Sequence, residues 1–282
     1  MPDPYQSPVP LDRMLFTMVD PHRGFEVAHN RWYERDHFYA GCMIGRGWFA
    51  GQRWISPRRL KDLRFPAAGP VAVPVDAGSY LAVYWMTSED PDLTWATEQV
   101  RWLYANGRGF PDRTLVHSGI YRYLGTTHRD PDGVPVELAF DHGYPGLGVV
   151  VVEPAPGTTR DELQATLDAT ATALFTSDPR VDMVASFGVL DTAASRVRDA
   201  APTNDKQPTA PGQPGGPSLG SEGGTDDRIV QLAFVEGAPD DAWDWFRRYA
   251  DAIAETERGT VTFATPFFAA VVGTDAYLDE LW

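Results

Sequence analysis

The chain has 282 residues, of which 43% are hydrophobic and 12% are aromatic, and it carries a formal charge of -15 at pH 7. This composition fits a globular protein with a substantial core. The sequence has no dense run of Lys or Arg. Both nucleic acids and anionic membrane surfaces are therefore disfavoured as partners, since binding to either needs clustered positive charge.

The single cysteine, Cys42, excludes an intrachain disulfide and a cysteine-cluster metal site, and we expect it to be a buried, inert thiol. Residues 1–10 lack the basic and apolar regions of a secretory signal. No apolar run approaches the roughly 20 residues that a membrane span needs. The sequence therefore predicts a soluble, cytoplasmic protein.

The first half of the chain predicts the order β-α-β-β-α-β. Within 25–43, Phe25, Trp32 and Met43 fall near one stripe at helical spacing, whereas 79–87 is rich in β-branched and aromatic residues. The expected elements are a strand at 13–20, a helix at 25–43, strands at 48–56 and 79–87, a helix at 90–106 and a strand at 114–124.

The second half repeats this order, which predicts a first unit at 11–142 and a second, degenerate unit at 143–282. Its expected elements are a strand at 148–153, a helix at 158–175, strands at 181–190 and 228–236, a helix at 239–257 and a strand at 260–272. An insertion at about 192–227 is dominated by Pro, Gly, Ser, Thr, Asp and Gln. It cannot bury enough apolar surface to offset its ordering entropy, so we expect it to be disordered.

Several strands are apolar on both faces, for example residues 81–86. Such strands need cover on both sides. Helices can cover one face, and the sheet of the other unit can cover the second. We therefore expect an α+β fold in which two ferredoxin-like units form one barrel within the chain, with a homodimer possible.

The candidate site begins in the segment Asn30-Arg-Trp-Tyr-Glu-Arg-Asp-His37. On a helix, His29, Tyr33 and His37 share one stripe at four-residue spacing, and Asn30 lies seven residues before His37. His37 is suited to proton transfer because the ordinary histidine pKa of about 6.5 lies near working pH. The alternative is a histidine that packs or caps at the sheet edge. Asn30 could equally face solvent, and Trp32 is favoured as a core anchor over a substrate contact.

Further candidates lie on strands. His117 and Tyr121 face one way by the two-residue period of a strand, and they would line the same cleft as His37 if that side faces the helices. If it faces the barrel interior, they are buried, hydrogen-bonded core. Arg53 alternates with Trp54, and Trp85 with Tyr84, so one of each pair can face the cleft; Arg53 and Trp85 are the candidates. No zinc-site spacing and no glycine-rich nucleotide loop occurs, so we expect neither a metal nor a nucleotide.

The spacing N-x-W-Y-x-x-x-H at 30–37 resembles a segment of EthD-like proteins in the dimeric α+β barrel superfamily, and Gly51-Gln-Arg-Trp54 is a weaker match. The resemblance implies that substrate binds between helices and sheet, with His37 as the family-type histidine and Asn30, Trp32 and Tyr33 at matched positions. It also implies a cofactor-free enzyme that acts on an aromatic or polyketide-like molecule by proton transfer, as a cyclase, dehydratase, isomerase or monooxygenase of secondary metabolism.

Two alternatives stay open. Related barrels bind haem through a histidine, for which His117 is the candidate, and a non-catalytic barrel that binds small molecules would have the same architecture. The second unit lacks the N-x-W-Y-x-x-x-H spacing, and every histidine precedes residue 143. The sequence therefore places the candidate site in the first unit.

Overall fold

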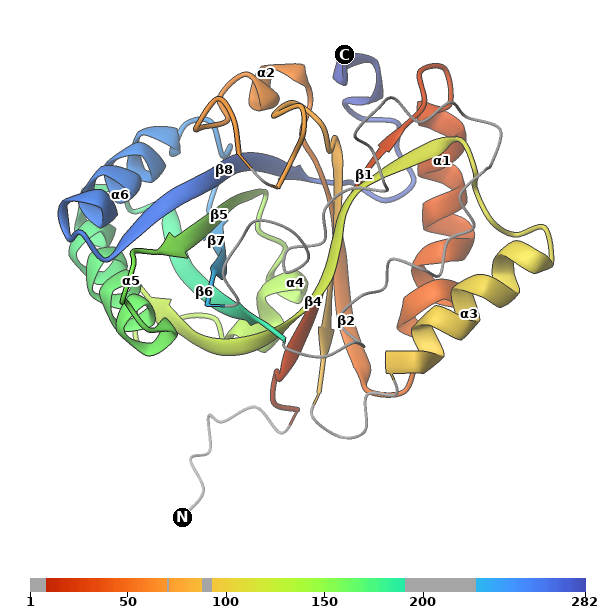
Figure 1. Ribbon diagram of the computed structural model, residues 1–282. Helices are drawn as coiled ribbons and strands as arrows, with labels where there is room; N and C mark the ends of the chain where they lie inside the picture. The colour runs from red at the N-terminus through yellow and green to blue at the C-terminus, as the bar shows by residue number, and fades with distance from the viewer. Residues whose placement is uncertain (1–8, 70, 88–92, 191–226) are drawn as a thin grey trace.

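The computed structural model describes residues 9–69, 71–87, 93–190 and 227–282. Eight antiparallel strands form a closed barrel in the order β1-β3-β2-β8-β5-β7-β6-β4 (Figure 1). Most of the insertion expected to be disordered lies outside the described residues. The strands are β1 Arg13–Pro21, β2 Trp48–Ile55, β3 Tyr80–Met86, β4 Arg113–His128, β5 Gly146–Pro154, β6 Val181–Val189, β7 Ile229–Val235 and β8 Gly259–Ala269.

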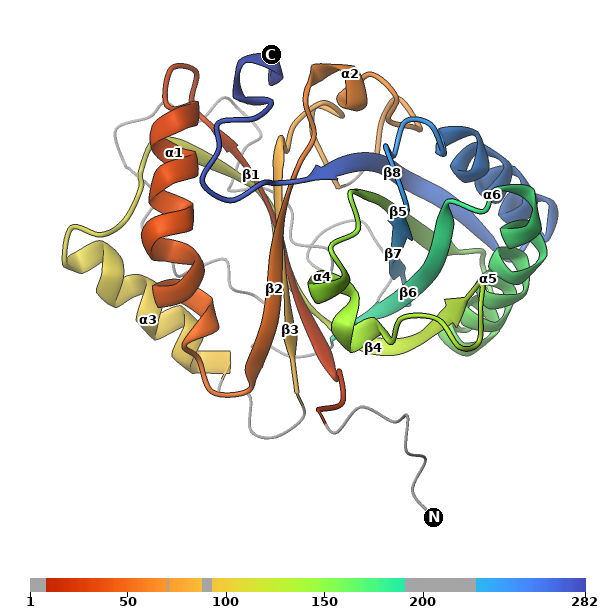
Figure 2. The same ribbon diagram turned by 180° about the vertical axis from the view of Figure 1, so that it is seen from behind.

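Each half of the chain contributes four neighbouring strands, in the orders β4-β1-β3-β2 and β8-β5-β7-β6. The main helices α1 and α3 lie outside the first set, and α5 and α6 lie outside the second, as the view from behind also shows (Figure 2). The predicted fold class, two ferredoxin-like units in one chain forming an α+β barrel, is confirmed. These helices are α1 Glu26–Trp32, α3 Leu93–Ala105, α5 Arg160–Leu174 and α6 Trp243–Glu255.

Two seams close the barrel between the halves. β4 pairs with β6 from Tyr121↔Val189 to His128↔Met183, whereas β2 pairs with β8 only at Trp54↔Ala269 and Ile55↔Phe268. The sheets therefore join edge to edge as well as meeting at their inner faces. Closure pairs the outer strands of the two sheets with each other, which reduces the edge available for pairing with other chains.

The barrel interior is a packed core. Met14, Phe16, Leu81 and Trp85 point inward, whereas the alternate residues of the same strands face the helices. Trp85 stacks on two further rings, Phe140 at 4.5 Å and Phe187 at 5.4 Å between centroids. This arrangement explains why β3 is apolar on both faces.

The second unit has an apolar core beneath its helices. A capping box at Thr159 and Glu162 begins α5. Leu163, Leu167 and Ala171 of α5 are buried, as are five residues of α6: Trp243, Trp245, Phe246, Tyr249 and Ile253. No histidine lies in this half of the chain.

Several elements differ from the sequence-based expectation. The helix expected at 25–43 is α-helical only to Trp32 and continues as two π-helical segments, Tyr33–His37 and Tyr39–Met43. β4 extends to His128, beyond the end expected for this strand at residue 124, and His128 is half-buried there. Short elements were not predicted: α2 Arg58–Lys61, α4 Ala139–His142, and 3-10 turns at Val136–Leu138, Phe175–Ser177 and Leu278–Glu280. In the described part of the chain, no helix has the length and apolar character of a membrane span.

Candidate functional site

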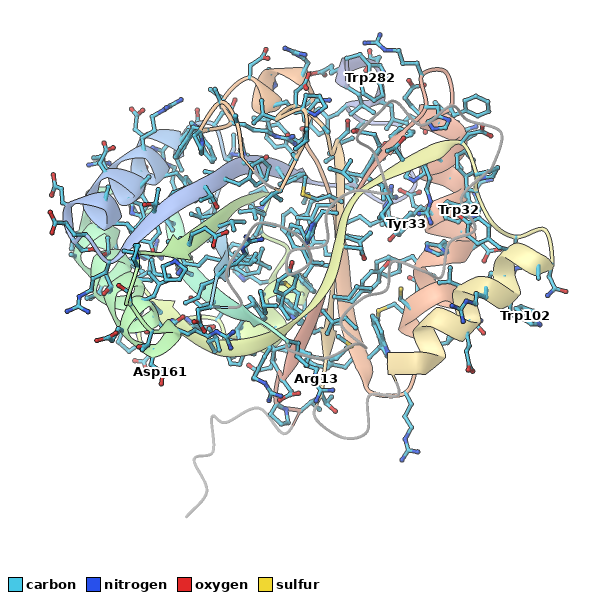
Figure 3. The ribbon with its side chains drawn as sticks, in the orientation of Figure 1. Arg13, Trp32, Tyr33, Trp102, Asp161 and Trp282 are labelled. Atoms are coloured by element: carbon cyan, nitrogen blue, oxygen red, sulfur yellow. The ribbon has the colours of Figure 1, made fainter. Side chains whose placement is uncertain are left out.

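The candidate site lies between the α1 segment and the outer face of β2 and β3. Figure 3 labels its two neighbouring aromatic residues, Trp32 and Tyr33, at the end of α1. Tyr33 is buried beside Tyr84 of β3, and the two hydroxyl groups lie 3.0 Å apart. This contact fixes the C-terminal end of α1 against the sheet of the first unit.

The π-helical turns determine how His37 is presented. The Phe38 N–H donates to the Tyr33 carbonyl, and the Ile44 N–H donates to the Tyr39 carbonyl at 3.1 Å, both five residues back. In a regular α-helix, residues five apart point about 140° away from each other. Here Trp32 and His37 stack instead, with ring centroids 4.5 Å apart and planes at 19°. π-helical turns of this kind are frequent at functional sites.

A buried arginine lies at the centre of the site. The Arg53 side chain is 5% exposed, and its Nη1 donates to Asn30 Oδ1 at 2.9 Å and to Glu34 Oε1 at 3.3 Å. The guanidinium carbon lies 4.6 Å from the Tyr33 ring centre and 5.1 Å from that of Tyr80. Its second terminal nitrogen, Nη2, has no hydrogen-bond partner among the described residues.

Two histidines next to this arginine are buried without full partners. His29 is 0% exposed, and within the described structure neither ring nitrogen has a hydrogen-bond partner. His37 is 7% exposed, and its Nδ1 likewise lacks a partner there. Burial lowers the pKa of both histidines well below the ordinary range, and the positive charges of Arg113 and Arg53 lower it further. Both imidazoles are therefore neutral at neutral pH.

The tyrosines of the site are held protonated. Burial raises the pKa of Tyr33 to about 12 and raises that of Tyr84 well above its usual value. The Tyr80 pKa is raised by the same cause, and no described group bonds its hydroxyl. Partnerless polar atoms of Arg53, His29, His37 and Tyr80 thus surround the Tyr33 side chain. Buried polar groups are normally bonded, so a concentration of unbonded ones indicates a place for water or a ligand.

The structure brings together five of the sequence-predicted residues, Asn30, Trp32, Tyr33, His37 and Arg53. Asn30 links two distant parts of the chain. Its Oδ1 accepts a hydrogen bond from Arg53, and its Nδ2 donates one to the Thr274 carbonyl at 2.9 Å. Asn30 is therefore buried and hydrogen-bonded on both sides, which corrects the alternative of a solvent-facing residue.

The other three predicted residues, His117, Tyr121 and Trp85, lie on the opposite face of the sheet, inside the barrel. His117 Nε2 and the Tyr121 hydroxyl are 2.7 Å apart, and the His117 ring packs edge-on against Phe16 at 5.7 Å. The sequence period could not choose between the two faces. The interior placement corrects the reading in which His117 and Tyr121 share a cleft with His37.

Sequence reasoning missed several residues of the site. Glu34 accepts a hydrogen bond from Arg53. Arg113, at the start of β4, places its guanidinium carbon 4.9 Å from the centre of the Trp32 ring. His29 belonged to the predicted stripe but not to the predicted site. Arg113 is distant in sequence from α1, so only the fold reveals its contribution.

The C-terminal tail, residues 270–282, forms hydrogen bonds and an ion pair with the α1 segment. The Gly273 N–H donates to Glu34 Oε2 at 3.0 Å, and Arg31 pairs with Asp275 at 2.8 Å. Trp282 donates from its indole nitrogen to Glu26 at 2.6 Å. The second half of the chain therefore contributes to the site of the first.

Buried Cys42 also lies near this region, and burial raises its pKa to about 12, as expected for an inert thiol. Among the described residues no group of three or more His, Cys, Asp or Glu side chains could hold a metal ion.

No protein-family model and no curated protein sequence matches this chain. Solved structures share its fold. A haem-bound variant of DypB from Rhodococcus jostii RHA1 is 13% identical over 99% of this chain and 98% of its own, with a TM-score of 0.52. A protein described as a chlorite dismutase is 12% identical over 97% and 100%, with a TM-score of 0.50. An anthrone oxidase-like protein is 12% identical over 93% and 92%, with a TM-score of 0.49. At these identities the likeness shows the fold alone.

Two of the described histidines, His117 and His29, do not fit haem as axial ligands. His117 Nε2 is already bonded to Tyr121 inside the packed barrel, so it is not available as an axial ligand. His29 has four aromatic rings around it at 5.2–5.8 Å, namely Trp32, Tyr33, Tyr80 and Phe110. These are ordinary packing distances between rings. The second unit has no histidine, and Leu163, Leu167, Trp245 and Tyr249 fill the space beneath its helices.

Proposed function

We propose that this protein is a cofactor-free, EthD-like enzyme that acts on an aromatic or polyketide-like small molecule by proton transfer. The observation that supports this proposal is the group of neutral, partnerless imidazoles beside a buried guanidinium. A neutral imidazole can accept a proton, and the negative charge that develops on the substrate would raise the lowered pKa of His37 toward the working range.

His37 is the proposed general base. The His37 side chain retains slight exposure, unlike that of His29, and its Nδ1 has no hydrogen-bond partner among the described residues. The stack on Trp32 and the edge contact with Tyr33 at 5.1 Å fix the plane of the ring. A base held in one orientation loses little entropy when the substrate binds.

Arg53 is the proposed partner of the negative charge that proton removal creates. His37 and Arg53 both contact the Tyr33 ring, so they lie on the same region of the sheet. Removing a proton from a phenol or from a C–H beside a carbonyl places charge on oxygen. The free Nη2 can donate to that oxygen, and preorganised donors of this kind lower the barrier most in a water-poor site. Tyr33 stays protonated throughout and acts by packing.

The aromatic walls are the reason for proposing an aromatic substrate. Trp32 and Phe110 stack on each other at 5.3 Å with planes at 30°, and both are half-buried at the outer side of the site. Tyr33 and Tyr80 line the inner side against β2 and β3. A planar ring can pack against such surfaces.

The test compares His37→Gln with the wild type against a panel of phenols, anthrones and quinones. Glutamine keeps a polar side chain but cannot take a proton, so turnover should fall by about 10²- to 10⁴-fold. His142→Gln is the matched control, because His142 is exposed and paired with Glu236 outside the site.

Each result has a distinct meaning. Full turnover by His37→Gln would remove His37 from catalysis. Saturable binding of panel compounds without turnover by the wild type would favour the non-catalytic binding barrel. A Soret band in the purified protein would overturn the cofactor-free proposal in favour of a haem enzyme.

A further inference from the structure

The charged groups that act on the two buried histidines are positive. Two guanidinium groups, those of Arg53 and Arg113, act on both His29 and His37. Glu34 is the carboxylate paired with Arg53, and the Glu34 side chain is itself 8% exposed. No carboxylate of the described residues pairs with Arg113, whose Nη2 donates to the Tyr104 hydroxyl at 3.2 Å. With both imidazoles neutral, Arg53, Arg113 and Glu34 together carry a net charge of about +1.

The neighbouring acidic residues are engaged elsewhere. Asp36 accepts two hydrogen bonds from Arg108, at 2.8 and 2.9 Å. Asp112 lies 3.8 Å from His22, and Glu26 accepts from Trp282. In the described structure none of these three carboxylates forms an ion pair with Arg53 or Arg113, so the surplus positive charge of Arg53, Arg113 and Glu34 is not neutralised by direct pairing.

Such a surplus costs free energy unless an anion compensates it, because a buried charge without a partner is poorly solvated. Of the two cations, Arg53 has the greater need of a compensating anion, since it is almost wholly buried and its Nη2 has no described partner. Arginine nitrogens suit oxyanions in particular, because charge-assisted hydrogen bonds to carboxylates and similar groups are strong and directional.

We propose that the substrate is an aromatic oxyanion, a carboxylate or ionised phenol on a planar ring, whose charged oxygen binds Arg53 Nη2 while Arg113 stabilises the same charge. This inference rests on the proposed function of the site and specifies its substrate class. The ring packs against Trp32 and Phe110, and the charged oxygen lies toward β2. His37 then accepts a proton from a different position of the same molecule, and the two guanidinium groups together stabilise the charge that this removal adds.

The experiment measures binding of 1-naphthoate and of its neutral counterpart 1-naphthamide by calorimetry at pH 7.5. These probes share a ring system and differ in charge. The naphthoate should bind about 10- to 100-fold more tightly, the range expected for a charge-assisted hydrogen bond in place of a neutral one.

Two variants test whether the arginines cause the preference for naphthoate. Arg113→Gln removes the cation that lacks an ion pair, and the double variant Arg53→Gln with Glu34→Gln removes a buried pair without leaving an unpaired charge. In each variant the affinities for naphthoate and naphthamide should differ by no more than a few-fold. Arg108→Gln is the control, since this exposed residue of the same region is already paired with Asp36, and it should keep the preference.

A second measurement does not depend on affinity. Histidine ring resonances followed by NMR report the pKa of His29 and His37, which a bound anion should raise and a bound neutral amide should leave unchanged. Equal binding of the two probes, or a preference that survives both arginine variants, would overturn the proposal.

The outcome is separable from that of the proposed function. A naphthoate preference in a protein that turns over no panel compound would support the anion site and count against the enzyme. Turnover of neutral substrates without any anion preference would do the reverse.

Discussion

Replacing His29 with phenylalanine should remove part of the acid sensitivity of this protein. His29 is wholly buried, and four aromatic rings surround it within 5.8 Å, so an aromatic side chain suits its surroundings. Phenylalanine also lacks the two ring nitrogens that have no described partner. Any steric strain from the larger ring is independent of pH, so the pH dependence of unfolding isolates the effect of the imidazole.

The sign follows from the lowered pKa of the folded state. Above the unfolded value of about 6.5, the imidazole is neutral in both states and contributes no pH dependence. As pH falls below that value, the unfolded chain binds a proton that the folded protein does not, so the free energy of unfolding decreases. The slope approaches about 1.4 kcal/mol per pH unit for each such histidine. The decrease continues until the pH reaches the folded pKa, which for His29 is well below the ordinary range.

Urea unfolding at pH 7.5 and pH 5.0 measures this difference. At pH 5.0 the wild type should have lost about 2 kcal/mol more than His29→Phe, because the term for one histidine is absent from the variant. His142→Phe is the control, since this histidine is exposed and lies outside the site, and its loss should be no smaller than that of the wild type. An identical loss in wild type and His29→Phe would mean that His29 becomes protonated without unfolding, which would refute its desolvated environment.

Three further predictions test the packing of the site and the fold. Gly41→Ala should lower the free energy of unfolding by about 1–3 kcal/mol, because a Cβ there would lie 2.8 Å from Nδ1 of His37; an unchanged melting temperature would argue against the stack on Trp32. Thr159→Ala should cost about 1 kcal/mol in urea unfolding by removing the N-cap of α5, and an unshifted midpoint would contradict the capping box. The proposed first unit, residues 11–142, should self-associate in light scattering when expressed alone, because its apolar inner sheet face loses its cover; a well-folded monomer would disprove that dependence.

The sequence was sufficient for the architecture. Apolar residues on both faces of β3 required cover on two sides, and the repeated order of elements supplied two sheets to provide it. The closed barrel is the geometric consequence. The π-helical turns after Trp32 were not predictable, because the apolar spacing of residues 25–43 also fits a continuous α-helix.

The candidate site was predictable only where its residues are close in sequence. Asn30, Trp32, Tyr33 and His37 lie within two turns of one helix, so helical spacing brought them together. The face of β4 occupied by His117 could not be chosen, because a two-residue period defines two faces without saying which is inside. Arg113 depends on tertiary structure that no local pattern contains.

The contacts between the C-terminal tail and the α1 segment have a consequence for biosynthesis. Arg53 emerges early, but Asn30 and Glu34, which hold it, are themselves bonded to Thr274 and Gly273. At translation rates of about 5–20 residues per second, roughly 10–45 s separate the synthesis of Arg53 from that of Thr274. During that interval the nascent chain contains every proposed catalytic residue but not the tail that immobilises them. Activity should therefore arise only when the tail docks, so that a truncated translation product would bear the catalytic residues and still be inactive.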